Sequence, residues 1–331
     1  MKVAGTPPKI QYISHGARET GGYAHEQFFA QSLSEALSGN PNSYAEVRFR
    51  RNFKGFFNWV LLAIKTFFAA DRNAVVITVA RLAWPVRLKQ LLGNGKLLLV
   101  LHNYDPNDGK PRLYYALLNS FLRHAAKNSD KIRVVVVAPY WQRFFEDRFM
   151  VPATLFPNFF DANTLQIIGN SGRKNPKLIH FGMFSDKIDI KKYIVLYHLL
   201  KELGFVCYFS SSEPVFCPDL PVSVFQKHGD YLKQVAGSAA TVILNKTIEG
   251  WSRVAHESIL LGTPVIASSG GGLEELVRLS GGRVCDNPED VVSIITTALP
   301  AITFDNTLFE PAEKKQYLEK IISFVQARAV T

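Results

Sequence analysis

The 331-residue sequence has few cysteines, no long apolar run and no excess of charge in its second half. Its three cysteines, Cys207, Cys217 and Cys285, are too few for a disulfide scaffold, and none has the spacing of a metal-ligand pair. No stretch reaches the ~18 consecutive apolar residues that span a bilayer, and the N-terminus lacks an apolar segment of signal-peptide length. These absences predict a cytoplasmic protein that does not cross a membrane.

The composition is that of a globular protein. Hydrophobic residues make up 47% of the chain and charged residues 20%, which excludes disordered, collagen-like and low-complexity classes. The length is about twice that of an average domain and therefore favours two domains.

The net charge of +10 is unevenly distributed. Residues 1–165 hold 21 basic and 11 acidic side chains, whereas residues 166–331 hold 17 of each. The whole excess therefore belongs to the first half, which indicates an anionic partner for that half.

Short, nearly all-apolar runs alternate with helical patterns along the whole chain. Such runs are typical of strands covered on both faces of a parallel sheet, so two consecutive series predict two doubly wound α/β domains. We expect an N-terminal domain over 1–165, a C-terminal domain over 166–311 and a last helix over 312–331 that crosses back to the first domain. The polar segment 163–176 is interpreted as the linker. The predicted strands are 9–15, 73–79, 96–103, 132–139, 177–184, 206–211, 222–227, 240–245 and 264–268, and helices are predicted over 25–37 and 112–127.

The densest chemistry lies between residues 249 and 275. Glu249 and Glu257 are separated by seven residues, the first in a loop after a predicted strand and the second on the following helix. Gly270, Gly271 and Gly272 then come directly after strand 264–268 and open another helix. Main-chain amides at a glycine-rich helix start bind anions, so this junction predicts a diphosphate site. Two solvated acids at a helix start are the competing interpretation.

This pair of glutamates resembles the signature of retaining glycosyltransferases of the GT-B fold, in particular glycosyltransferase family 4. Gly21-Gly22 after the first strand, Phe156-Pro157-Asn158 with Asp161, and Ile179-His180-Phe181-Gly182 are similar to further elements of that family. The resemblance covers nearly the full chain. It implies two Rossmann-like domains that face a cleft, with the acceptor bound by the first and a nucleotide-sugar by the second.

The resemblance also implies roles for individual residues of the donor site. Glu249 would contact hydroxyls of the donor sugar near the reaction centre, and Glu257 would bind the nucleotide ribose. The amides of Gly271, Gly272 and Leu273 would hold the donor phosphates. Where the family usually has an arginine after the strand glycine, this chain has Met183, so Lys187 is the expected phosphate-neutralising cation, with Lys246 or Arg253 as substitutes.

A transferase of this kind does not need a bound metal. The sequence has no Asp-x-Asp motif, the motif that holds a metal-bound diphosphate in the other major transferase fold. We therefore expect neither a metal nor a cofactor, with the nucleotide-sugar as substrate. Transfer would take place on one face of the sugar, and the leaving diphosphate would take up the acceptor's proton.

Five positions of the first half are candidates for contact with the substrates. His102 follows a strong strand and is a candidate catalytic base, with a purely structural histidine as the alternative. His15 and Arg18 lie in the predicted loop after the first strand and are assigned to the acceptor. Gly21 and Gly22 would let the main chain approach the donor and the acceptor.

A basic and aromatic stretch over residues 48–68 has helical spacing. Arg48, Arg50, Arg51 and Lys54 precede its apolar residues, which is the composition of a helix resting on an anionic membrane. An ordinary sheet-covering helix explains the same pattern. The other cations of this half are dispersed without a binding motif, so a nucleic-acid partner is not expected.

The sequence thus predicts a retaining, metal-independent hexosyltransferase at the inner face of the cell membrane. Its acceptor would be a polysaccharide, a glycolipid or a lipid-linked glycan. Two alternatives stay open: a paralogue that binds a nucleotide-sugar or glycan without turnover, and an epimerase or hydrolase of the same fold.

Overall fold

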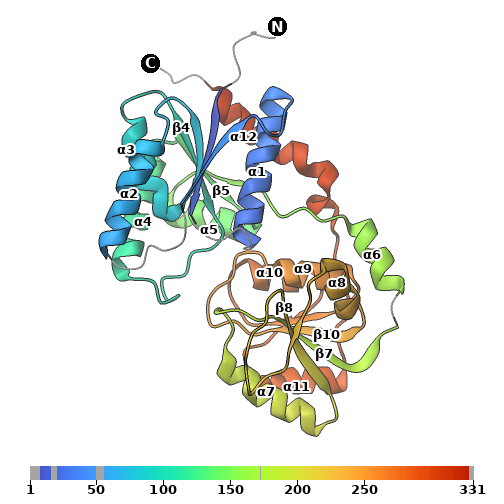
Figure 1. Ribbon diagram of the computed structural model, residues 1–331. Helices are drawn as coiled ribbons and strands as arrows, with labels where there is room; N and C mark the ends of the chain where they lie inside the picture. The colour runs from blue at the N-terminus through green and yellow to red at the C-terminus, as the bar shows by residue number, and fades with distance from the viewer. Residues whose placement is uncertain (1–7, 16–20, 50–55, 172, 328–331) are drawn as a thin grey trace. The chain divides into compact units, whose positions relative to one another are not determined.

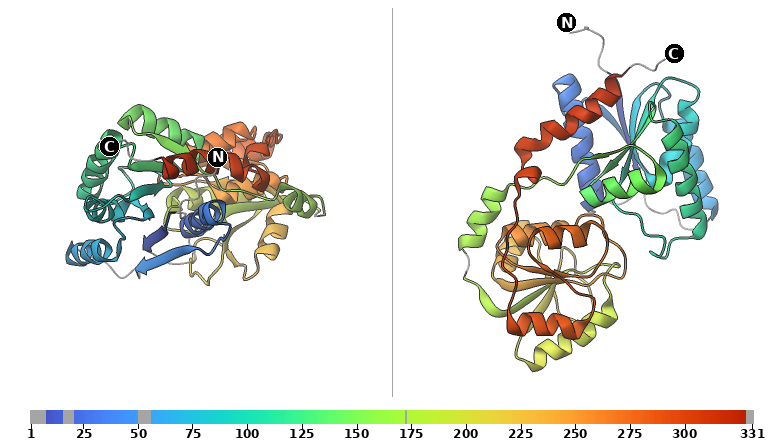
Figure 2. Two further views of the ribbon diagram at one scale, coloured as in Figure 1. Left: turned by 90° about the horizontal axis from the view of Figure 1, so that it is seen from above. Right: turned by 180° about the vertical axis from the view of Figure 1, so that it is seen from behind.

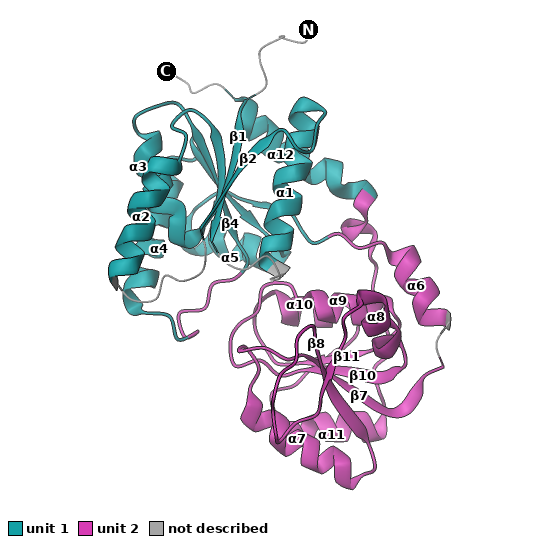
Figure 3. Cartoon of the chain, in the orientation of Figure 1, with its two compact units in different colours: residues 1–102, 109–158, 312–331 teal, residues 103–108, 159–311 magenta. Residues whose placement is uncertain are grey.

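The computed structural model describes residues 8–15, 21–49, 56–171 and 173–327. Within them the chain forms two compact units (Figure 3). Unit 1 draws on residues 1–102, 109–158 and 312–331, and unit 2 on residues 103–108 and 159–311. The short segment 103–108 therefore belongs to unit 2, although the residues on both sides of it in sequence belong to unit 1.

Unit 1 is built on a six-stranded sheet with the order β2-β1-β3-β4-β5-β6, in which all neighbours are parallel. The central strand β4 is buried along its whole length, as expected of an apolar strand that is covered on both faces. The strands are β1 (Ile10–His15), β2 (Tyr44–Phe49), β3 (Val75–Val79), β4 (Lys96–Leu101), β5 (Ile132–Val136) and β6 (Ala153–Leu155).

Helices cover both faces of this sheet (Figure 1). Helices α2, α3 and α4 lie on one side, whereas α1 and α12 pack against each other on the other side. The C-terminal helix is anchored by the buried Lys96, whose ammonium donates to the main-chain carbonyls of Phe324 and, at 2.6 Å, Ala327. The helices are α1 (Gly21–Ser38), α2 (Phe56–Ala69), α3 (Ala83–Gln90), α4 (Arg112–Lys127), α5 (Pro139–Phe149) and α12 (Lys314–Gln326).

Unit 2 repeats the scheme with a second six-stranded parallel sheet in the order β12-β11-β10-β7-β8-β9. Helices α7 and α11 cover one face and α8, α9 and α10 the other (Figures 1 and 2). The strands are β7 (Asn175–Met183), β8 (Val206–Ser211), β9 (Val222–Val224), β10 (Ser238–Ile243), β11 (Val265–Ala267) and β12 (Arg283–Val284). The helices are α6 (Ala162–Ser171), α7 (Ile190–Glu202), α8 (His228–Ala236), α9 (Arg253–Leu260), α10 (Gly271–Leu279) and α11 (Pro288–Thr297).

The strand order reverses once in each sheet, between β1 and β3 in unit 1 and between β7 and β10 in unit 2. Loops at the carboxyl ends of the strands diverge at such a point, and ligands of open α/β sheets bind there. In unit 2 the diverging loops begin after Met183 and after Ile243.

Two predictions of local structure are wrong. The expected linker over 163–176 contains α6 and the start of β7. Helix α6 forms because its apolar face packs on α8 and α9, with Leu165 buried and Gly169 close against the main chain of Leu261. The carboxylate of Asp161 caps its first turn by accepting from the Thr164 amide at 3.1 Å.

The basic and aromatic helix expected within residues 48–68 does not include Arg48. Arg48 lies on the edge strand β2, paired with Ser14 of β1, and the described helix begins at Phe56. The β-branched and aromatic residues around Arg48 favour a strand, and its backbone is paired with a neighbouring strand on one side.

Candidate active site

Two loops of unit 2 are tied together at the switch point of its sheet. The Lys246 amide donates to the Lys187 carbonyl at 2.9 Å, and the Asp189 amide donates to the Leu244 carbonyl at 2.9 Å. These bonds hold the loop after β7 against the loop after β10. Lys187 and Glu249, which lie on the two loops, are thereby brought together, with 3.9 Å between the Lys187 ammonium and the Glu249 carboxylate.

Glu249 is held at both its side chain and its main chain. The Asn245 side-chain amide donates to Glu249 Oε2 at 2.8 Å, which fixes the plane of the carboxylate. The Glu249 carbonyl accepts from the Gly272 amide at 3.1 Å, in a bridge between Glu249 and Gly271. About 19% of the Glu249 side chain is exposed, so an outside group can reach it.

Helix α10 begins at the glycine run. Gly270 and Gly271 have φ values of 103° and 72°, which only glycine adopts without strain. The Gly270 amide donates to Glu274 Oε2 at 2.7 Å, and this bond lowers the pKa of Glu274. The first amides of a helix have no partner within it, and here Glu249 occupies that of Gly272. Of the three amides assigned to phosphate, that of Gly272 is thus occupied by the Glu249 carbonyl.

Glu257 is buried on α9 between two basic side chains. Its Oε1 lies 3.5 Å from His228 Nε2 and 3.7 Å from the Arg253 guanidinium. Burial raises the pKa of Glu257, and Arg253 and His228 act in the opposite direction. The hydroxyl of Tyr231 is buried nearby, and burial together with the Glu257 charge raises the pKa of Tyr231. Glu257 is thus an acceptor set in a polar, largely desolvated pocket.

The buried His256 helps to fix the loop that carries Glu249. The Trp251 indole donates to His256 Nδ1 at 2.9 Å, and His256 Nε2 lies 2.7 Å from Asn306 Oδ1. Burial lowers the pKa of His256 to about 3, so the ring is neutral and its Nε2 proton points to Asn306. The same loop is held by the segment 103–108, where Asn103 donates to the Ile248 carbonyl and Asp105 accepts from the Ile248 amide.

In unit 1, Gly22 and His102 are neighbours. A Cβ atom at Gly22 would lie 3.4 Å from His102 Nε2, so a side chain larger than glycine would crowd the ring. His102 Nε2 lies 2.9 Å from the carboxylate of the buried Glu26, which also accepts from the Tyr12 hydroxyl at 2.8 Å. The imidazole is thereby oriented with Nδ1 free of the Glu26 contact.

The remaining predicted residues are scattered. His15 ends β1, and the exposed Arg48 lies with its guanidinium carbon 6.0 Å from the centre of the Tyr23 ring. Gly21 opens α1. Arg18, Arg50, Arg51 and Lys54 lie outside the described residues.

Four partners of these sites escaped the sequence reasoning: Glu26, Asn245, His228 and Asp105. Glu26 follows Gly22 by four residues, one helical turn, which is a signal that the sequence does contain. Asn245 stands four residues before Glu249, but in a loop that spacing carries no geometry. His228 and Asp105 are distant in sequence from the groups they contact, so only the fold could find them.

Within the described ranges, no group of three or more His, Cys, Asp or Glu side chains is placed to hold a metal ion. No helix in the same ranges is both long and apolar enough to cross a bilayer.

The chain was compared with known proteins. No protein-family model matches it, and no curated protein matches it in sequence. Solved structures do match over nearly the full length. Sucrose-phosphate synthase from Thermosynechococcus elongatus covers 96% of this chain and 95% of its own, with 12% identity and a TM-score of 0.62.

Two further structures give similar values. Anabaena HepE in complex with UDP and glucose covers 96% of this chain and 95% of its own at 14% identity, with a TM-score of 0.62. The α,α-trehalose 6-phosphate synthase from Burkholderia multivorans covers 97% and 93% at 11% identity, with a TM-score of 0.60. These neighbours are GT-B glycosyltransferases. The chain therefore has the GT-B fold, with two six-stranded parallel sheets that are each flanked by helices.

Proposed function

We propose that this chain is a retaining glycosyltransferase that takes its sugar from a nucleoside-diphosphate sugar. The observation that carries the proposal is the bridge between the Glu249 loop and the start of α10, at the switch point of the unit 2 sheet. A carboxylate, a cation and a helix N-terminus meet there, which are the groups that a sugar diphosphate requires. UDP is the first nucleotide to test, because the neighbour HepE holds UDP and glucose.

The donor phosphates are assigned to the amides of Gly271 and Leu273 and to Lys187. Helix amides and the helix dipole favour negative charge at this position. Met183 stands where a guanidinium would give a bidentate contact, and it is 47% exposed. Lys187, with half of its side chain exposed, is free to turn from Glu249 to a diphosphate. On this account a resident metal is not required.

The ribose is assigned to Glu257. An ionised carboxylate accepts hydrogen bonds from both hydroxyls of a ribose, and the Arg253 guanidinium, 3.7 Å from Glu257 Oε1, compensates its charge after burial. Nucleotide binding therefore favours the ionised form of a group whose pKa is raised in the free protein.

The reaction breaks the bond between the anomeric carbon and the β-phosphate oxygen and forms one from that carbon to the acceptor oxygen. The acceptor proton moves to the leaving phosphate oxygen, so no protein base is consumed. Lys187 and the α10 amides stabilise the charge on the diphosphate. Glu249, oriented by Asn245, holds the sugar hydroxyls so that attack takes place on the face from which the diphosphate departs.

The acceptor is assigned to unit 1, around Gly22, His102 and His15. There His102 would form a hydrogen bond with a hydroxyl group of the acceptor. The positive excess lies in this part of the chain and supports an acceptor at an anionic membrane surface, such as a glycolipid or lipid-linked glycan on the cytoplasmic side. Arg48 is the described member of the four cations assigned to membrane contact.

The test combines binding with turnover. Calorimetry with UDP, GDP and ADP, each with and without EDTA, should give binding for at least one nucleotide that EDTA leaves unchanged. The matching nucleotide-sugars should then release nucleoside diphosphate faster when a lipid-linked acceptor is added. NMR of the product should show the anomeric configuration of the donor.

Glu249→Gln should lower the transfer rate about 100-fold while nucleotide affinity changes by less than about threefold. Glu202→Gln, on the exposed end of α7 in the same unit, is the matched control and should behave as the parent. Binding without turnover would make the chain a sugar-nucleotide receptor. Release that no acceptor accelerates would make it a hydrolase, and equal turnover by Glu249→Gln would refute the site.

A further inference from the structure

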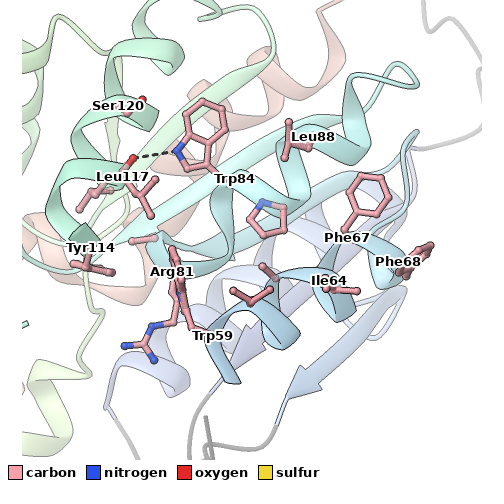
Figure 4. A pocket seen from close by; sticks show the side chains of 15 residues that line it. Trp59, Ile64, Phe67, Phe68, Arg81, Trp84, Leu88, Tyr114, Leu117 and Ser120 are labelled. Carbon is pink, nitrogen blue, oxygen red and sulfur yellow. Dashed lines mark hydrogen bonds between the residues drawn. The ribbon is translucent and has the colours of Figure 1, made fainter. Parts of the chain in front are cut away.

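Unit 1 carries an apolar groove that the assigned chemistry does not use. It has a volume of about 510 Å³ and lies between α2, α3 and α4 (Figure 4). We call it the α2–α4 groove. Trp59 and Trp84 stand in its walls. The small side chains of Ala63 and Ala80 also line it.

The walls of the groove have few groups that could form hydrogen bonds with a polar ligand. Among its lining side chains only Arg81, Ser120 and the tyrosine and tryptophan tips are polar. The Trp84 indole already donates to the Leu117 carbonyl at 3.0 Å, as Figure 4 shows. Such a lining fits a hydrocarbon chain better than a sugar or a nucleotide.

Further exposed apolar side chains stand on the helices that form the groove. Phe57 and Phe68 on α2 are 78% and 73% exposed, and Leu88, Leu91 and Leu92 at the end of α3 are also exposed. Of these, Phe68 and Leu88 line the groove itself. Exposed apolar side chains gathered at a groove are typical of an interaction site.

The charge of the helices that form the groove favours an anionic lipid surface over a second copy of this chain as the partner. The segments 56–69, 80–90 and 112–127, which form the groove, contain no Asp or Glu and seven Lys or Arg. Lys89 stands with its ammonium 5.1 Å from the centre of the Phe67 ring, at the wall of the groove. A second copy of this chain, docked through the same face, would bring two sets of cations together, whereas an anionic lipid surface is complementary to them.

We propose that the α2–α4 groove takes one acyl chain of an anionic membrane phospholipid. Lys65, which follows the lining residue Ile64 on α2, and Lys89, which lies over the Phe67 ring, are assigned to the lipid headgroups, and the exposed Phe57 and Phe68 enter the acyl boundary. This deepens the proposed transfer at a membrane surface and rests on it. The chain is held by unit 1 through a lipid drawn out of the bilayer, without a membrane-spanning helix.

The four tryptophans allow a direct test with the full chain. Trp59 and Trp84 line the groove, whereas Trp141 and Trp251 are buried elsewhere. Vesicles of phosphatidylglycerol and phosphatidylcholine with brominated acyl chains should quench the fluorescence relative to unbrominated vesicles. Vesicles of phosphatidylcholine alone should not. Replacing both groove tryptophans, W59F with W84F, should abolish the quenching and leave vesicle sedimentation within about threefold.

Two kinds of variant separate the groove from general adhesion. Ala63→Phe fills the groove and should reduce quenching at least twofold with vesicle sedimentation retained, and Ala80→Leu repeats the test should the first variant fold poorly. Lys65→Gln and Lys89→Gln should each weaken vesicle binding about fivefold. Leu113→Ser, on the exposed part of α4, is the control for loss of a surface hydrophobe and should leave quenching intact.

Several results would overturn the inference. These results are the absence of binding to anionic vesicles, binding without quenching, quenching that Ala63→Phe leaves unchanged, and a dimer in solution that Ala63→Phe dissociates. UDP binding is measured on the same samples. Loss of quenching with UDP binding intact counts against the groove alone, whereas quenching without nucleotide binding or transfer counts against the proposed function.

Discussion

Units 1 and 2 share one scheme, a six-stranded parallel sheet between two layers of helices, yet their chemistry lies in different layers. In unit 2 the polar groups gather at the carboxyl ends of the strands, where Glu249, Lys187 and the α10 amides meet. In unit 1 an apolar groove lies between α2, α3 and α4. The same scaffold therefore carries charged groups at the carboxyl ends of the strands in one unit and an apolar groove between the helices of the other.

The comparison also separates how the two sites are held. The Glu249 loop depends on buried polar contacts, including the Trp251, His256 and Asn306 series. The α2–α4 groove is lined mainly by packed apolar side chains, and the Trp84 indole in its wall donates to the Leu117 carbonyl. Buried titratable groups make the first arrangement sensitive to pH. Beside the second, burial lowers the pKa of His124, whose ring lies 5.3 Å from that of Trp84.

Acid should unfold unit 2 before unit 1. Burial lowers the pKa values of His180 and His256 to about 3, against 6.5 for an ordinary histidine. The stability that these neutral rings contribute is present above pH 6.5 and is lost as the pH falls toward 3. Each should cost roughly 2–3 kcal/mol of the free energy of unfolding between pH 6.5 and 4.5.

Amide hydrogen exchange of peptides from β10 and β4 measures the two units separately. His180→Gln should flatten the pH dependence of the β10 peptides, whereas His198→Gln, exposed on α7, should not. Equal acid sensitivity of β4 and β10 would contradict the distinction between the units.

His102→Asn should lower the transfer rate about 100-fold, because His102 is assigned to positioning the acceptor hydroxyl. It should leave the affinity for nucleotide within twofold, because the donor is assigned to unit 2. His124→Asn, on α4 of the same unit, should leave the rate within threefold. Steady-state kinetics alongside calorimetry measures both quantities. A fall in nucleotide affinity equal to the fall in rate would assign His102 to the donor.

Glu257→Gln should weaken UDP binding about tenfold, because a neutral amide is a poorer acceptor for the ribose hydroxyls. The free energy of unfolding gives the independent check. Since the pKa of Glu257 is raised, its contribution to stability is present below pH 4.5 and declines as the pH rises through the folded-state pKa. The free energy of unfolding of Glu257→Gln, relative to that of the parent, should therefore be higher at pH 8 than at pH 4. The opposite trend would be evidence against a buried, destabilising charge at Glu257.

Lys187→Ala should weaken nucleoside-diphosphate binding about fivefold at low salt, with a smaller effect at high salt. Lys191→Ala, an exposed lysine on α7, is the matched control. An equal loss of nucleoside-diphosphate affinity in both variants would mean that Lys187 contributes only non-specific electrostatic attraction.

The sequence predicts the apolar strands best. Strand 206–211 and helix 112–127 have the predicted bounds, because burial on both faces and a regular 3.6-residue period leave strong patterns. Helix α6 was missed because its stability comes from packing on α8 and α9 rather than from its polar sequence. Arg48 was assigned to a helix because aromatic residues fit the apolar face of a helix and a strand equally well.

The donor site could be anticipated where its parts are local. The glycine run and the helix bearing Glu257 are readable because strand, turn and helix follow one another in sequence. The occupation of the Gly272 amide by the Glu249 carbonyl could not be foreseen, because it joins two loops 23 residues apart. The α2–α4 groove likewise combines three segments that no sequence pattern links.

Amide hydrogen exchange with and without UDP tests the central claim most directly. The account predicts protection of residues 245–252 and 270–274, together with α9 around Glu257, and no change in α2, α3 and α4. Protection confined to unit 1, or no protection at any UDP concentration while another nucleoside diphosphate also fails, would contradict it.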